Sequence, residues 1–66
     1  MFISFSDRDG SYCYNTDKIE TIYRYKDASR LCIKLRDKSL ATSFCFDFPE
    51  ECFDTYKEIE RQLREG

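Results

Sequence analysis

Four cysteines are the side chains in this sequence with the most distinctive chemistry: Cys13, Cys32, Cys45 and Cys52. They could form disulfides, bind zinc or remain free thiols that pack as small hydrophobic side chains. Successive cysteines are 19, 13 and 7 positions apart, whereas structural zinc sites nearly always contain a close Cys-x-x-Cys pair. Histidine, the other common zinc ligand, is absent. We expect four free cysteines and no metal site. The alternatives are disulfides or a redox pair formed by Cys32 and Cys45.

The other side chains offer little support for catalysis. Without histidine the chain cannot build a histidine-dependent acid–base pair or catalytic triad. Gly10 is isolated, so the sequence has no glycine-rich phosphate loop. A reactive thiol at Cys32 would need a cationic neighbour such as Arg30 or Lys34, and that alone is weak support. We expect a non-enzymatic protein with no catalytic residue, no metal and no cofactor.

Hydrophobic spacing in the first half of the chain predicts a hairpin, one helical turn and a third strand. Alternate residues from Met1 to Phe5 are apolar, which is typical of a half-buried strand. Side chains at residues 15–17 can cap a short helical turn, and Ile19 and Ile22 lie three positions apart, as on one helix face. Strands are expected at residues 1–6, 11–14 and 21–25, with turns at residues 7–10 and 26–29.

The second half shows the clearest two-residue period, followed by a helical pattern. Residues 31–35 and 40–48 alternate between apolar and polar side chains, which predicts two further strands. The inward positions of the second of these are expected to be Phe44, Phe46 and Phe48. Pro49 suits the first turn of a helix, and an apolar stripe with helical spacing follows it. That stripe consists of Cys52, Tyr56, Ile59 and Leu63.

Together these patterns predict a single small α+β domain over residues 1–66. An antiparallel sheet of four to five strands carries one C-terminal helix packed on one face, in the order β-β-(helical turn)-β-β-β-α. The two-residue period places Cys32 and Cys45 on the sheet face that the helix leaves uncovered, and Cys13 is expected there too. Cys52 points from the helix into the core. A four-cysteine metal site would need ligands from both faces of the sheet, which this geometry forbids.

The net charge of −2 conceals an uneven distribution along the chain. Residues 22–38 contain six basic and two acidic residues, whereas the rest of the chain contains five basic and eleven acidic residues. We therefore expect a basic outer sheet face and an acidic helix. The first candidate partner-binding surface is the uncovered sheet face, with Arg30, Cys32, Lys34, Arg36 and Cys45. The second is the helix face, with Glu50, Glu51, Asp54, Glu58 and Glu60.

These surfaces predict a protein-binding regulatory module that occupies the surface of another protein or of a nucleoprotein complex. A homodimer through the open sheet face is also considered, because a domain of 66 residues has a small core. A competing interpretation is a single-stranded nucleic-acid binder, in which Tyr23 and Tyr25 stack on bases beside the basic strands. Nucleic-acid-binding domains are usually basic, however, and this chain is acidic overall.

The sequence also bears on the compartment. No segment is apolar and uncharged for long enough to span a membrane. The first residues lack the basic start and long apolar stretch of a secretory signal. We therefore expect a cytoplasmic protein without membrane contact.

Part of the sequence resembles a known family. Residues 15–22, Asn-Thr-Asp-Lys-Ile-Glu-Thr-Ile, are followed by a strand ending at Leu35, a turn, another strand and an acidic helix. This outline resembles the small FlbD-type flagellar proteins, which carry a similar Asn-x-x-x-Ile-Glu-x-Ile turn after an opening hairpin. It departs from them at Asp37-Lys38, where that family tends to have Asn-Gly, so the resemblance implies the fold more than a flagellar role.

A second resemblance rests on size and charge. A compact, acidic, single domain without catalytic groups is similar to phage-encoded inhibitors such as anti-CRISPR proteins. That resemblance implies an inhibitor from a phage or mobile element, which binds a bacterial defence nucleoprotein. The carboxylates of the helix would then occupy the positions at which the phosphates of a nucleic acid bind the partner.

Overall fold

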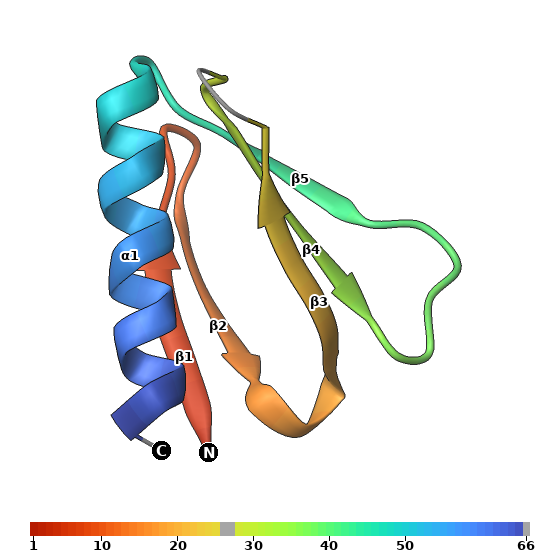
Figure 1. Ribbon diagram of the computed structural model, residues 1–66. Coiled ribbons are helices and arrows are strands. Elements are labelled where there is room, and N and C mark those ends of the chain that lie inside the picture. The colour runs from red at the N-terminus through yellow and green to blue at the C-terminus, as the bar shows by residue number, and fades with distance from the viewer. Residues whose placement is uncertain (26–27, 66) are drawn as a thin grey trace.

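The computed structural model describes residues 1–25 and 28–65 and has an α+β architecture (Figure 1). In chain order the described elements are β1 (Phe2–Ser6), β2 (Ser11–Asn15), the 3₁₀ turn η1 (Thr16–Lys18), β3 (Ile19–Arg24), β4 (Arg30–Leu35), β5 (Thr42–Cys45) and α1 (Pro49–Glu65). The predicted element order, the antiparallel pairing and the C-terminal helix are confirmed. The turn expected at residues 26–29 lies partly outside the described residues.

The strands of the described residues form two antiparallel sheets, where we expected one continuous sheet. β1 pairs with β2, and β4 lies between β3 and β5 in the second sheet. The chain changes sheet at η1, the turn that the capping pattern predicted. There the Asn15 side chain accepts a hydrogen bond from the Asp17 backbone N–H at 3.0 Å, and the Arg36 backbone N–H donates to the Lys18 carbonyl at 2.8 Å. The turn therefore directs β3 onto β4 and away from β2.

An aromatic cluster holds the two sheets together. Phe44 on β5 is 2% exposed, and its ring centroid lies 4.9 Å from that of Phe5, 4.8 Å from that of Tyr12 and 6.1 Å from that of Tyr14. All three contacts are edge-to-face, an arrangement that the charge distribution of aromatic rings favours. The three partners belong to the first sheet, so Phe44 connects it to the second. Other buried core residues include Ile3, Ile19, Leu31, Ile33 and Phe46.

Helix α1 runs along one side of the molecule and contacts both sheets (Figure 1). It begins at Pro49, as predicted. Cys52 and Ile59 are 0% exposed, and Tyr56 packs against the same core. The predicted apolar stripe is therefore the packed face of the helix, although its last member, Leu63, is 38% exposed.

β5 covers only Thr42–Cys45, so it is shorter than the strand at residues 40–48 that the two-residue period predicted. Phe46 stays buried, and its N–H donates to the Ser29 carbonyl at 2.8 Å. The chain then turns to enter α1, which breaks the alternation and leaves Phe48 59% exposed. The prediction that Phe48 faces inward is therefore wrong. Leu40, at the other end of the expected strand, lies in the loop before β5 and is 81% exposed.

The Gln62 side chain on α1 occupies the outer edge of β1. Its amide oxygen accepts a hydrogen bond from the Ser4 N–H at 3.0 Å, and its amide nitrogen donates to the Ser4 carbonyl at 3.0 Å. A neighbouring strand would satisfy the same two groups, so a helix side chain blocks this edge. The contact joins residues 58 positions apart, and the two chain ends lie at the same end of the molecule (Figure 1).

Candidate binding surfaces

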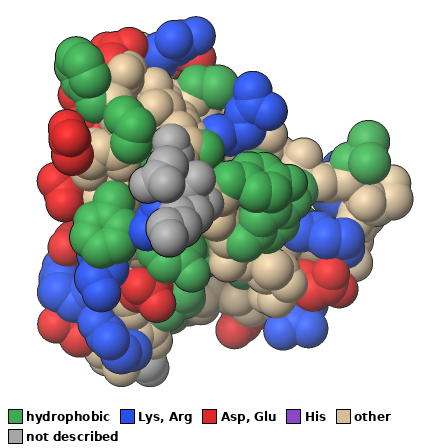
Figure 2. Space-filling model, turned by 45° about the horizontal axis from the view of Figure 1, so that its top comes forward, with side chains coloured by type: hydrophobic (Ala, Val, Ile, Leu, Met, Phe, Trp, Pro, Cys, Tyr) green, Lys and Arg blue, Asp and Glu red, His purple; other side chains and the backbone are tan. Residues whose placement is uncertain are grey.

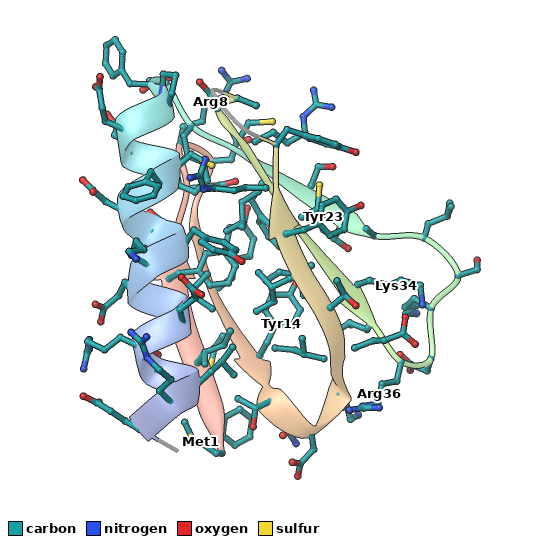
Figure 3. All side chains as sticks on the ribbon, in the orientation of Figure 1. Met1, Arg8, Tyr14, Tyr23, Lys34 and Arg36 are labelled. Atoms are coloured by element: carbon teal, nitrogen blue, oxygen red, sulfur yellow. The ribbon has the colours of Figure 1, made fainter. Side chains whose placement is uncertain are left out.

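The outer face of the second sheet carries most of the first predicted surface. Arg30, Cys32 and Lys34 alternate along β4 with the core positions. Cys45 on β5 lies directly opposite Arg30, so it shares their face. Arg36 lies beyond the end of β4 and is not part of this face. Figure 3 shows Tyr23 and Lys34 on this side of the sheet, away from α1.

Cys32 lies on the predicted face, but neighbouring side chains of the same chain cover it. It is 4% exposed although it does not belong to the main core. Tyr23 lies directly opposite it on β3, and on the other side the Ser43 hydroxyl oxygen is 3.6 Å from its sulfur. Interaction with the Cys32 thiol, together with burial, raises the pKa of Tyr23 above its ordinary value. Tyr23 also packs edge-on against Tyr25, with ring centroids 5.9 Å apart, so aromatic rings supply the apolar part of this face.

The other cysteines differ in exposure, and all four are free thiols. Cys13 is exposed, as its place on the outer side of β2 predicted. Cys45 is half-buried, and Cys52 is fully buried in the core, where burial raises the pKa of its thiol.

The basic residues of the middle strands do not form one continuous surface. The Lys34 ammonium pairs with the Glu20 carboxylate at 2.7 Å. The Arg36 side chain donates to a backbone carbonyl of η1 at 3.1 Å. The Arg24 guanidinium lies on the helix side of the sheet, 4.6 Å from the ring centroid of Phe53. The predicted basic face is therefore divided, and three of its cations are already engaged within the molecule.

A shallow hollow of about 480 Å³ lies at the end of the molecule where α1 begins. We call it the Arg8–Arg30 hollow. It is lined by Arg8, Tyr25, Ala28, Ser29, Arg30, Cys45 and Phe46. Figure 3 places Arg8 at this end, and Figure 2 shows hydrophobic and basic side chains close together there. The hollow thus combines two residues of the predicted surface, Arg30 and Cys45, with an arginine from the first hairpin.

Asp7 fixes the hairpin turn that supplies Arg8. Its carboxylate accepts hydrogen bonds from the N–H groups of Asp9 at 2.8 Å and Gly10 at 3.0 Å, and from the Cys45 N–H at 3.3 Å. The Arg8 N–H donates to the Cys45 carbonyl at 3.2 Å. Sequence reasoning missed Arg8 because this attachment joins residues 38 positions apart, and the only local signal is an aspartate at the start of a turn.

The hollow offers two guanidinium groups beside an aromatic ring. Among residues 1–25 and 28–65, Arg30 has no ion-pair partner, and Arg8 has only its neighbour Asp9 at 4.0 Å. Tyr25 is 58% exposed at the same hollow. Guanidinium groups bind carboxylates and phosphates through paired hydrogen bonds. The hollow can therefore accept an anionic group with an apolar or aromatic neighbour.

The acidic helix face is partly neutralised within α1. Glu58 pairs with Arg61, which lowers the pKa of that carboxyl, and Arg61 also pairs with Glu65 at 2.8 Å. Glu50 and Glu51 lie in the first turn of the helix, where its dipole favours negative charge. Together with Asp54 they keep the predicted face acidic around the start of α1, near the exposed rings of Phe48 and Phe53.

Acid should destabilise the fold through the Glu20–Lys34 pair. The hydrogen bond and charge of Lys34 lower the pKa of Glu20 below its ordinary value of 4.5. Because the pKa of Glu20 is lower in the folded state, the pair stabilises the fold fully at pH values above the pKa of Glu20 in the unfolded chain. This stabilisation is lost as pH falls from that value through the pKa of Glu20 in the folded chain. We expect Glu20→Gln to reduce the fall in melting temperature between about pH 5 and pH 3. Asp37→Asn, at an exposed turn position, is the control, and an equal effect of both variants would contradict this assignment.

Comparison with known proteins adds no relative, since no family model, curated protein or solved structure matches the chain. The resemblances to FlbD-type proteins and to phage inhibitors therefore stay predictions. In the described ranges, no helix is long and apolar enough to cross a membrane. No group of three or more potential metal ligands was found among residues 1–25 and 28–65.

Proposed function

We propose that the protein is a non-catalytic binding module that recognises an acidic segment of another protein at the Arg8–Arg30 hollow. The observation that supports it is the pair of guanidinium groups beside the exposed Tyr25 ring. Within residues 1–25 and 28–65, Arg30 has no ion pair and Arg8 has only the 4.0 Å contact with its neighbour Asp9, which leaves guanidinium donors for an external anion. By occupying the partner's acidic surface, a protein of this size regulates or inhibits that partner, whether it is free or part of a nucleoprotein complex.

The charge arrangement favours a protein partner over single-stranded nucleic acid. Single-strand binders need a basic groove that follows several phosphates. Here Lys34 is paired with Glu20, and Arg24 is stacked on a helix ring, so two cations of the middle strands that could extend such a groove are engaged. Two arginines at one hollow suit one or two carboxylates.

The proposal is tested with labelled probes and matched variants. The probes are a flexible glutamate- and tyrosine-containing peptide and an oligothymidine of similar length, measured by fluorescence anisotropy at low and moderate salt. We expect the acidic peptide to bind, and the double change Arg8→Gln/Arg30→Gln to weaken it about tenfold or more, because two charge-assisted contacts are lost. The control double change Lys34→Gln/Arg36→Gln removes the same charge from engaged positions and should have little effect.

Two results would overturn the proposal. One is tighter binding of oligothymidine with a steep dependence on salt, which is typical of phosphate neutralisation and would indicate a nucleic-acid binder. The other is equal weakening of the peptide by both double variants, which would indicate attraction by overall charge. Capture experiments with and without nuclease, using the same variants as bait, then identify the partner.

A further inference from the structure

The strand edges of the described residues are protected unequally. The β1 edge is blocked at Ser4 by the Gln62 amide, and the β5 edge is occupied at Cys45 by the Asp7 carboxylate and the Arg8 N–H. On β3 the only interruption is an irregularity in pairing between Ile19 and Thr21. Beyond its ladder with β4 and the η1 turn, the backbone of β3 makes no hydrogen bond to any described residue. Unpaired N–H and C=O groups therefore run along β3.

A hollow lies beside this open edge, between β3 and α1. We call it the β3–α1 groove; its volume is about 300 Å³. Thr21 and Ile22 line it from β3, and Tyr56, Glu60 and Leu63 line it from α1. Ile22 and Tyr56 are half-buried against the core, and Leu63 is 38% exposed, so these three side chains form an apolar part of the groove lining. The combination of an open strand edge and a partly apolar groove sets β3 apart from the blocked edges.

The groove also carries an acidic group without a cation. Glu60 is half-buried in it and has no ion pair within residues 1–25 and 28–65. Glu20 also lines the groove, but its carboxylate is engaged by Lys34. Glu58, on the same helix, is paired with Arg61. Glu60 is therefore the carboxylate that a basic side chain lying in the groove would meet.

We propose that the β3–α1 groove binds an extended, basic segment of a partner protein, which adds to β3 as a further strand. The backbone of the segment pairs with the open edge, as in known cases of strand addition. Apolar side chains on one face of the segment cover Ile22, Tyr56 and Leu63, and a lysine or arginine pairs with Glu60. The groove and the Arg8–Arg30 hollow share no lining residue, so this proposal does not depend on the proposed function.

The test uses a library of eight-residue peptides in which Val, Ile, Leu or Phe alternates with Thr or Ser and one residue on the apolar face is Lys or Arg, and a matched library with Glu at that position. Binding is measured by fluorescence anisotropy, and the site is mapped by amide hydrogen exchange. We expect binders from the basic library and slower exchange of β3 amides in the complex. Glu60→Lys should weaken them roughly tenfold or more. Glu51→Lys makes the same charge change at the start of α1 and should leave binding within about twofold.

Several outcomes would overturn the proposal. They are the absence of any binder in the basic library, equal binding of both libraries, and protection that falls outside β3. Equal effects of Glu60→Lys and Glu51→Lys would also overturn it, because they would indicate attraction to the whole acidic helix. Glu60→Gln, which removes the charge with little change in shape, checks that a loss reflects charge and not altered folding. Arg8→Gln/Arg30→Gln should leave this binding unchanged, which separates failure of this proposal from failure of the first.

Discussion

Replacing Phe44 by alanine should leave most of the protein unfolded at 25 °C. Phe44 is 2% exposed and contacts the rings of Phe5, Tyr12 and Tyr14, which belong to the other sheet. Truncating a buried phenylalanine to alanine typically lowers the free energy of unfolding by about 3–5 kcal/mol. A core in a chain this short rarely supplies more than about 3–5 kcal/mol in total. The variant therefore loses a stabilisation comparable to that of the whole domain.

Phe48→Ala is the matched control, because it makes the same chemical change four residues further along the chain. Phe48 is 59% exposed, so we expect a change within about 0.5 kcal/mol. Urea unfolding followed by far-ultraviolet circular dichroism measures both variants, and Phe44→Leu should fall between them. Similar losses for Phe44→Ala and Phe48→Ala would contradict the proposed position of Phe44 between the sheets.

Native Cys52 should react with iodoacetamide roughly 10²- to 10⁴-fold more slowly than Cys13. Cys52 is 0% exposed and Cys13 is exposed, so a reagent reaches Cys52 only after the core opens. To expose a core residue, the protein must open at a cost of up to the full free energy of unfolding. An unfolding free energy of about 3–5 kcal/mol corresponds to this range of rate ratios. Burial also raises the pKa of the Cys52 thiol, which reduces the reactive thiolate further.

Mass spectrometry of proteolytic fragments, sampled during labelling, measures all four cysteines in one experiment. In urea the four rates should converge, which is the control for intrinsic reactivity. Fast native labelling of Cys52 would show that the helix does not pack as described. The same data bear on a thiol enzyme. Fast labelling of exposed Cys13 follows from access alone, whereas labelling of half-buried Cys45 faster than Cys13 would indicate an activated thiol.

The elements that the sequence predicted correctly depend on local signals. Asn15 caps η1 within two residues, and Pro49 begins α1 at the position its fixed backbone angle favours. The helical stripe identified Cys52 and Ile59 as buried because their spacing alone defines one helix face. Alternation along β4 likewise placed Cys32 and Lys34 on one face.

The features that could not be predicted depend on contacts between distant residues. Alternation cannot show whether neighbouring strands pair, so the division into two sheets at η1 was not predicted. Alternation also shows on which face of the sheet Cys32 lies. It does not show that Tyr23, on the neighbouring strand β3, covers the Cys32 side chain. Arg8 joins Arg30 only because Asp7 attaches the first hairpin to Cys45. The candidate surface was therefore half predicted: Arg30 and Cys45 were named, and their cationic neighbour was not.

The bonds between Gln62 and Ser4 have a consequence for the order in which the chain folds. β1 and β2 are joined by a short turn and can pair locally, whereas the side chain that occupies the β1 edge lies 58 positions away in sequence. Until α1 packs, the β1 edge is open, and Ile3 and Phe5 lack the helix that covers their side of the core. The last turns of α1 therefore close the folding domain against premature pairing with other chains.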